Sequence, residues 1–215
     1  SVVPYHIAPC KVADQIYWLY ASNKKIYAVK TDTGGVTTHT NLTRQTTGTD
    51  VDYTATPNAW TSTLLSGIPI FNNGTDDPQI WDLNIANRMS ALTNWPANTK
   101  CKSLRAYKNY LIALNVTKSG TNYPYMVKWS HPADPGSVPS TWNPADATKD
   151  AGETDLAEGY DQIVDGLQLR DSFIIYKENS VWNMTFTGGA YVFQFKKVLG
   201  ISGAMNRNCI VELDG

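Results

Sequence analysis

The segment that decides the fold class is residues 164–186, VDGLQLRDSFIIYKENSVWNMTF. It contains three short apolar runs, separated by the polar groups 170–172 and 178–180. Short runs rich in Ile, Val, Tyr, Phe and Trp that end at turn-forming residues are typical of β-strands joined by tight hairpins. The third run, 181–186, alternates apolar and polar side chains, as in a strand with one buried face. The segment therefore predicts an antiparallel meander.

The same pattern recurs along the chain. Residues 103–115 align without a gap with residues 166–178, so that Ile112 falls on Ile175. Two earlier apolar runs, 16–20 and 68–71, also follow turn-forming residues, and each of the four runs precedes a second run with an aromatic residue. Repeated meanders of about 40 to 50 residues are typical of a β-propeller, with one repeat for each blade. We therefore expect an all-β chain whose four meanders are blades arranged around an axis.

The repeat also predicts which side chains form the core. The tryptophans of the aromatic strands are expected to bury large apolar faces between blades, and one isoleucine in each preceding strand is expected to be buried with them. These predicted core residues are Trp81, Trp129, Trp182, Ile70, Ile112 and Ile175.

We expect the propeller to span residues 1–215, with insertion loops near 31–58, 84–100 and 132–161. Residues 1–13 contain two prolines and are predicted to form an edge strand, where proline is tolerated.

Two further elements are predicted towards the middle and the end of the chain. A short helix is expected at residues 85–92, before Pro96. Residues 209–213 are predicted to begin another strand, followed by a turn. Because a propeller cannot close on half a blade, we expect the propeller to be incomplete in this chain and to continue in a longer polypeptide.

Composition excludes several classes of partner. Charged residues make up 17% of the 215 residues and the formal net charge is −1, which gives no case for a dedicated nucleic-acid binder. No apolar run reaches the roughly 18 residues of a membrane-spanning helix. The three cysteines, Cys10, Cys101 and Cys209, lack zinc-site spacing and are predicted to be free, buried thiols.

No catalytic set emerges from the sequence. The chain has no G-x-S-x-G motif, and His6, His39 and His131 are far apart, so we predict no catalytic residues, no metal and no cofactor. The acidic stretch 150–161 is predicted to be a solvated loop, and its spacing does not match a calcium-binding EF-hand. Residues 130–136 are faintly similar to the sialidase Asp-box, but with the wrong spacing.

Three phrases, taken in order, resemble a known family. IFNNGTDDPQIWD at 70–82 resembles the hairpin F-x-N-G-x-D-x-P-x-x-W-D, and KWSHPADP at 128–135, followed by Trp142, resembles the turn W-S-x-P-x-D-P-x-x-W. FIIYKENSVW at 173–182 resembles a strand pair with the pattern K-E-x-S-I-W/Y. This ordered set, over roughly residues 59–215, resembles the propeller-containing tail nozzle (tail tubular, or stabilisation) proteins of short-tailed bacteriophages, which are several hundred residues longer.

The resemblance implies a non-enzymatic virion protein, assembled in the cytoplasm of the host bacterium. It would form a homo-hexameric ring below the portal and adaptor and contact adaptor proteins and tail fibres or spikes. The ring would extend the genome-ejection channel, whose wall should bind passing DNA only weakly and without sequence preference. A near-neutral wall, or one with carboxylates such as those of 150–161, would suit this role. The alternative is a carbohydrate-binding or glycoside-hydrolysing propeller, which needs carboxylates or aromatic residues clustered at one rim.

Overall fold

The computed structural model describes residues 2–189 and 191–212, and every regular element among them is a β-strand. Sixteen of these strands form four separate four-stranded sheets, and two more form a small hairpin. Within each sheet the strands follow chain order and pair antiparallel. The predicted all-β class is confirmed, and the four predicted hairpins lie in four separate meanders.

The strand bounds are as follows. The first sheet contains β1 (His6–Val12), β2 (Gln15–Ala21), β3 (Ile26–Thr31) and β4 (Thr37–Asn41). The second contains β7 (Thr61–Leu65), β8 (Ile68–Asn72), β9 (Gln79–Ile80) and β10 (Ser90–Ala91). The third contains β11 (Thr99–Tyr107), β12 (Tyr110–Lys118), β13 (Thr121–Trp129) and β14 (Gly152–Asp155). The fourth contains β15 (Ile163–Leu169), β16 (Ser172–Lys177), β17 (Val181–Phe186) and β18 (Phe193–Leu199), and the small hairpin is β5 (Gln45–Thr46) with β6 (Thr49–Asp50).

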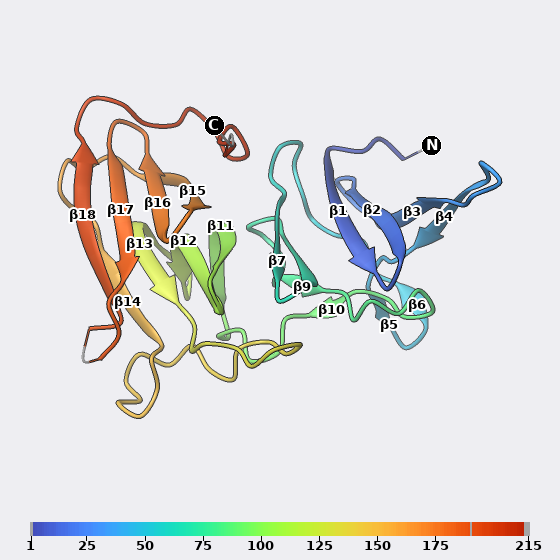
Figure 1. The fold of residues 1–215 in the computed structure, drawn as a ribbon, viewed down its shortest axis with the longest axis horizontal. Helices are drawn as coiled ribbons and strands as arrows, with labels where there is room; N and C mark the ends of the chain where they lie inside the picture. Colours follow the sequence, from blue (N-terminus) through green and yellow to red (C-terminus); the bar gives the residue numbers. More distant parts are fainter. Residues whose placement is uncertain (1, 190, 213–215) are drawn as a thin grey trace.

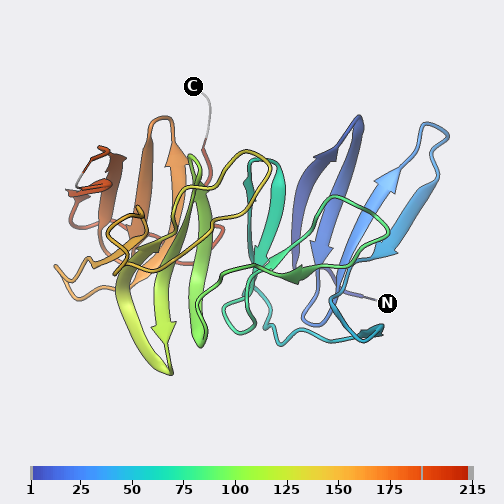
Figure 2. The ribbon, with the colours of Figure 1, turned by 90° about the horizontal axis from the view of Figure 1, so that it is seen from below.

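The four sheets lie side by side in chain order, with the first sheet at one end of the molecule and the fourth at the other (Figures 1 and 2). The first strand of each sheet is the one that meets its neighbours: β7 contacts β1 and β11, and β11 contacts β15. We call β1, β7, β11 and β15 the inner strands. β8, β12 and β13 also contact a neighbouring sheet, but most of the backbone contacts between sheets come from the inner strands.

One turn geometry is repeated in all four sheets. The inner strand always connects to the second strand through two residues, and the first of these has a φ of 51° at Ala13, 49° at Ser66, 51° at Lys108 and 53° at Arg170. Positive φ at this position is typical of the two-residue turns whose twist matches that of antiparallel strands. The turns therefore mark equivalent positions in the four repeats.

These turns correct the gap-free alignment of residues 103–115 with 166–178. Lys108 is equivalent to Arg170, which shifts the match by one residue and places Ile112 on Ile174 instead of Ile175. A shift of one residue moves a side chain to the other face of its strand. Ile112 and Ile175 nevertheless lie in the same core, because the facing sides of the third and fourth sheets both contribute to it.

Three hydrophobic cores lie between consecutive sheets. The first joins Tyr17 and Leu19 of β2 to Phe71 of β8. The second joins the second sheet to the third, and the third joins the third sheet to the fourth. The two middle sheets thus bury both faces, since side chains alternate between the faces of a strand.

The predicted core residues lie in these cores. Ile70, Trp81, Ile112, Ile175 and Trp182 are buried, whereas Trp129 is half-buried. Each tryptophan lies on or directly after the third strand of its sheet, but their registers differ. Trp129 pairs with Ile112, Trp182 pairs with Ile175, and the Trp81 amide donates to the Pro69 carbonyl.

The predicted helix at 85–92 is wrong. The segment consists of turns and β10, because side chains compete for its backbone amides. Asp82 accepts from the amide of Asn84, and Asn84 accepts from the amide of Ala86, an arrangement that favours turns over helix.

Of the two strands predicted near the chain ends, one is confirmed and the other is not. The predicted edge strand is confirmed, since β1 lies at the edge of the first sheet and contains Pro9. Residues 209–212 form no strand, contrary to expectation, and the rest of that prediction lies outside the described residues. The predicted insertions contain strands of their own: β4 to β6 lie in 31–58, β10 in 84–100 and β14 in 132–161.

Candidate functional site

A buried ion pair joins two inner strands. Arg105 of β11 donates from Nε to Asp165 Oδ1 at 2.9 Å and from Nη2 to Oδ2 at 2.5 Å. The Asp165 side chain is 1% exposed, and Ser103 Oγ donates to its Oδ1 at 2.5 Å. A bidentate ion pair of this kind fixes the position of β11 relative to β15, because both hydrogen bonds form only in one geometry.

The pair belongs to a longer hydrogen-bonded chain. Arg105 Nη1 donates to the Ser62 carbonyl of β7 at 2.9 Å, and Ser62 Oγ lies 2.7 Å from His6 Nε2 of β1. Asn208 accepts from Arg105 Nη2 at 2.8 Å, and its amide donates to Asp165 Oδ2 at 2.9 Å. All four inner strands and Asn208 are thus connected by polar contacts, which we call the inner-strand network.

Burial and charge set the protonation of the inner-strand network. Burial alone would raise the pKa of Asp165, but Arg105, Ser103 and the Asn208 amide outweigh it, so that the pKa is lowered and the carboxylate is ionised at neutral pH. Burial, followed by the positive charge of Arg105, lowers the pKa of His6 to about 4. His6 is therefore neutral at pH 7.

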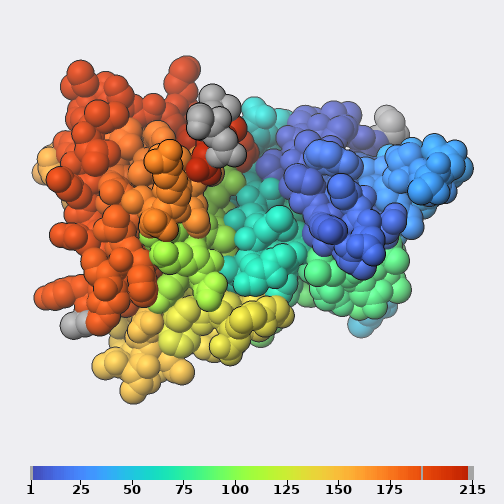
Figure 3. Space-filling model, in the orientation of Figure 1, coloured from blue at the N-terminus to red at the C-terminus, as the bar shows by residue number. Residues whose placement is uncertain are grey.

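The C-terminal segment, residues 200–212, crosses the inner strands. Arg207 Nη1 donates to the carbonyls of Ala59 at 2.9 Å and Lys102 at 2.6 Å. The Ala204 amide donates to the Lys177 carbonyl at 2.9 Å. Beside it, a Cβ built on Gly203 would lie 2.1 Å from that same carbonyl, so only glycine fits. In the space-filling view this segment lies between the fourth sheet and the second (Figure 3).

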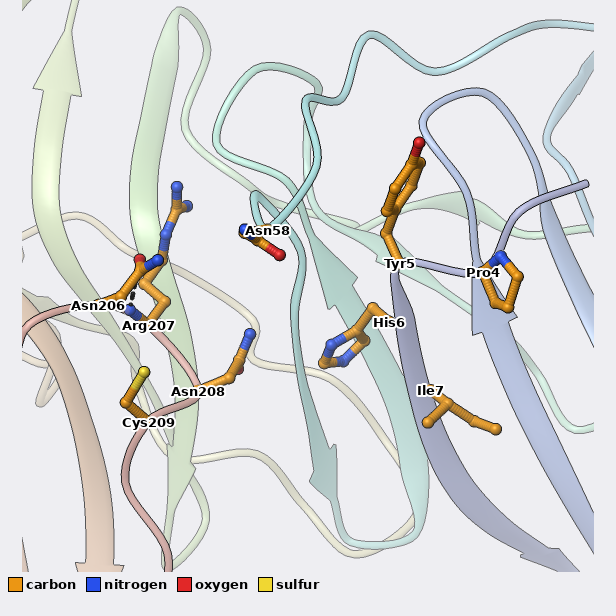
Figure 4. Close-up of a pocket in the computed structure, with 9 residues that line it drawn as sticks. All are labelled: Pro4, Tyr5, His6, Ile7, Asn58, Asn206, Arg207, Asn208 and Cys209. Atoms are coloured by element: carbon orange, nitrogen blue, oxygen red, sulfur yellow. Dashed lines mark hydrogen bonds between the residues drawn. The ribbon is translucent and has the colours of Figure 1, made fainter.

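An open pocket of about 640 Å³ lies between this segment and the start of the chain. Its lining combines apolar residues with three asparagines and Arg207, and His6 points from β1 into the space facing Asn208 (Figure 4). The lining residues are Pro4, Tyr5, His6, Ile7, Asn58, Asn206, Arg207, Asn208 and Cys209. Such walls suit hydrogen bonding to a polar ligand or a peptide segment.

His6 Nε2 and Ser62 Oγ lie within hydrogen-bond distance, as in a pair of general base and nucleophile, but their surroundings do not suit catalysis. A base with a pKa near 4 removes protons poorly at neutral pH. Ser62 does not line the pocket, and its hydroxyl is held against the His6 ring. The contact therefore serves to join β1 to β7.

The prediction of a solvated loop at 150–161 holds for residues 157–160, which are exposed and form no strand, but is wrong for residues 151–156 and 161. Residues of this stretch form β14, where Glu153 accepts from Lys118 at 2.7 Å and from Lys128 at 2.8 Å. Asp161 is 5% exposed on its side chain and pairs with the fully buried Lys177 at 2.9 Å. Two of the five acidic side chains thus neutralise buried lysines, Glu153 with Lys128 and Asp161 with Lys177. Glu153 lies on β14, at the opposite edge of the third sheet from the inner strand β11.

The K-E-N-S phrase that contains Lys177 holds two segments of the chain together, and we call this set of contacts the Lys177 clamp. Lys177 Nζ donates to the carbonyls of Leu156 at 2.7 Å and Glu158 at 3.1 Å, in addition to its pair with Asp161. Asp161 in turn accepts from Ser180 Oγ at 2.8 Å and from the Asn179 amide at 3.0 Å. The K-E-N-S phrase thus ties β16 and its turn to the segment that precedes β15.

The other two motifs have similar roles. In the 70–82 hairpin, Asp76 accepts from Arg44 Nη2 at 2.7 Å and from the Thr54 amide at 2.8 Å, which ties the second sheet to the 42–55 segment. In the 128–135 turn, Ser130 Oγ accepts from the Leu111 amide at 3.0 Å. This bond uses the serine of the stretch that is faintly similar to an Asp-box.

The histidines and cysteines are not brought together. His39 lies on β4 and bonds Tyr20, whereas His131 lies in the loop after β13 and accepts from the Asp150 amide. Cys10 and Cys101 are buried free thiols as predicted, but Cys209 is exposed. Among residues 2–189 and 191–212, no group of three or more His, Cys, Asp or Glu residues could hold a metal ion.

No protein-family model matches the chain, and no curated protein matches it. Over the described ranges, none of the structure is a helix long and apolar enough to cross a lipid bilayer.

Replacing Lys177 by Met should destabilise the protein strongly. The change leaves the Asp161 carboxylate buried without its cation, which costs about 3 to 5 kcal/mol. Lys197→Met is the matched control, because the Lys197–Glu158 pair is largely exposed and is worth about 0 to 1 kcal/mol. Denaturant unfolding of both variants measures the difference, and equal losses would show that Lys177 is no clamp.

Replacing His6 by Gln should reduce the pH dependence of stability between pH 6.5 and 4. Because the pKa of His6 is lowered on folding, the unfolded chain binds the proton first, and stability is lost as pH falls through this window. The glutamine side chain keeps a donor for Ser62 but cannot titrate. Unfolding free energies at pH 7 and pH 4.5 test this, and an unchanged slope in the variant would contradict the assignment.

Proposed function

We propose that this chain is a structural subunit of the tail of a short-tailed bacteriophage, in the position of the tail nozzle. Its four meanders are blades of a β-propeller that this chain contains in part. The observation that carries the proposal is the repeat itself: four meanders with the same turn, joined through their inner strands. Repetition of this kind around an axis is how propellers protect their sheet edges.

The motifs that resemble nozzle proteins support the same role. Asp76, Ser130 and Lys177 each come from one of the three phrases, and each bonds to a neighbouring segment of the scaffold. Motif residues that hold sheets and turns together are what a virion protein needs, because it must keep its shape while DNA passes.

In this proposal six copies form a ring below the portal and adaptor, and the long connections between strands contact neighbouring tail proteins and fibres or spikes. The ring carries no enzymatic activity. DNA passes it with weak, sequence-independent contacts, in keeping with a formal net charge of −1. Assembly takes place in the host cytoplasm and the mature protein resides in the virion.

One observation favours a second candidate, a carbohydrate-binding propeller. The pocket beside His6 contains three asparagines, an arginine and the half-exposed ring of Tyr5, which together offer hydrogen bonds and an apolar surface to a sugar. This candidate needs no ring and no virion.

Antibodies against this chain should label the tails of virus particles purified from a culture that carries its coding sequence. Immunogold electron microscopy makes the measurement, with antibody pre-absorbed on the purified chain as the control. Gold at the tail vertex is the expected result. Absence of the chain from purified particles, together with glycan binding by the isolated chain, would overturn the proposal in favour of the second candidate.

A further inference from the structure

A second cavity, of about 330 Å³, lies beside the third sheet in the middle of the chain. One wall is the side of that sheet turned toward the second sheet, since Lys128 of β13 pairs with Ala113, which packs in the core between these two sheets. Lys118, at the end of β12, lies on the same wall. The other walls come from the connecting segments 94–99 and 141–144. We call this space the Lys128 cavity.

The two connecting segments are held against each other, so the walls of the Lys128 cavity are formed in advance. The rings of Trp95 and Trp142 pack edge to face, with centroids 4.8 Å apart, and both belong to the core between the second and third sheets. Asn94 Nδ2 donates to the Pro139 carbonyl at 3.3 Å, and Trp95 Nε1 donates to the Thr99 carbonyl at 2.7 Å. In Figure 1 both segments run below β11.

The cavity wall carries an excess of positive charge. Glu153 is shared by two lysines, and its carboxylate accepts from Lys118 Nζ at 2.7 Å and from Lys128 Nζ at 2.8 Å. The Lys118 side chain is 31% exposed and that of Lys128 only 4%. Of the described residues that line the cavity, two are lysines and none is acidic. One carboxylate beside two ammonium groups leaves one positive charge without a partner among the described side chains.

The two most buried lysines differ in how their donors are used. A lysine ammonium has three N–H donors. Lys177 has a partner for each, since it pairs with Asp161 at 2.9 Å and donates to two backbone carbonyls at 2.7 and 3.1 Å. Lys128 is nearly as buried, but within the described part of the chain it donates only to Glu153. A buried donor without an acceptor is costly. The Lys177 clamp is therefore complete, whereas Lys128 can take further acceptors.

A second buried donor lies at the same cavity. Trp142 lines it and is 2% exposed, and its Nε1 has no acceptor among residues 2–189 and 191–212. Burial of an indole N–H usually requires a hydrogen-bond partner. The cavity thus combines positive charge with unused donors, which together select a ligand that brings negative charge and acceptor oxygens.

We propose that the Lys128 cavity binds a small molecule through an oxyanion, a phosphate or carboxylate group held between Lys118 and Lys128. A singly charged group balances the excess positive charge, and its oxygens accept the charge-assisted hydrogen bonds that the lysines have to give. The cavity lies at the lower end of the range of ligand pockets, about 300 to 1,000 Å³, so the ligand is small. The inference does not rest on the proposed tail function, and its failure would leave the labelling of virus tails unaffected.

Titration of the ¹⁵N-labelled chain with inorganic phosphate, and separately with acetate, tests the proposal by NMR. Sodium chloride keeps the ionic strength constant, because salt screens unspecific attraction to surface lysines. We expect saturable shifts of the amide resonances of 94–99, 141–144 and the adjoining ends of β12 and β13, and none with chloride alone. Tighter binding of phosphate or of acetate identifies the group that the natural ligand carries. No saturable shift with either oxyanion, or shifts scattered over the surface, would overturn the proposal.

Four variants separate an anion site from a purely structural set of charges. Lys118→Gln should weaken oxyanion binding by about tenfold or more, because it removes a charged donor, whereas Lys118→Arg should retain most of it. Glu153→Gln should strengthen binding, since it removes the carboxylate that competes for both lysines. Lys196→Gln is the matched control, because Lys196 is exposed on β18 in the fourth sheet.

Thermal unfolding shows which of these variants remain folded, and the half-exposed Lys118 allows the test even if Glu153→Gln does not fold. Unchanged affinity in Lys118→Gln would overturn the proposal. Weaker binding in a folded Glu153→Gln variant would do the same, because a carboxylate and a bound oxyanion cannot both be favoured by the same two charges.

Discussion

The inner strands depend on the ion pair between Arg105 and Asp165. Asp165 is almost wholly shielded from water, and a carboxylate in such a place is tolerated only with a cation and further hydrogen bonds around it. Arg105 supplies the cation, and its remaining N–H groups reach the Ser62 carbonyl and Asn208. One side chain thereby sets the relative position of β7, β11, β15 and the C-terminal segment.

Apolar packing then fills the spaces between the sheets. An antiparallel sheet often exposes one face to water, but the two middle sheets here have apolar residues on both faces. They are stable only because each is covered on both sides. The polar contacts fix where the inner strands meet, and the apolar contacts supply most of the free energy. The buried lysines add local clamps, such as Lys177 with Asp161.

Much of the fold could be predicted from the sequence, because strands and turns leave local signals. The runs around Ile112 and Ile175 alternate or are continuously apolar, and the turn residues between strands are polar. The exact register could not be predicted, because tolerance of positive φ at Lys108 and Arg170 is not apparent from residue type. The gap-free alignment of residues 103–115 with 166–178 is therefore displaced by one residue from the structural equivalence of the two strands. The helix predicted at 85–92 does not form, because the side chains of Asp82 and Asn84 accept hydrogen bonds from nearby backbone amides.

The inner-strand network was beyond sequence reasoning. His6, Ser62, Arg105 and Asp165 are separated by more than forty residues at each step and form no motif. They meet only because equivalent strands of four repeats lie next to one another. The acidic stretch shows the same difficulty, since the lysines that neutralise Glu153 and Asp161 come from other strands. Charge patterns along a chain do not show which charges meet in the folded protein.

The most direct test of this account is a double-mutant cycle on Arg105→Met and Asp165→Asn, measured by denaturant unfolding. We expect each single change to cost about 3 to 5 kcal/mol, since each leaves a buried polar partner unsatisfied. The double variant should lose clearly less than the sum, with a coupling energy above about 1 kcal/mol. Additive losses, with a coupling below about 0.5 kcal/mol, would show that the inner strands do not depend on this pair.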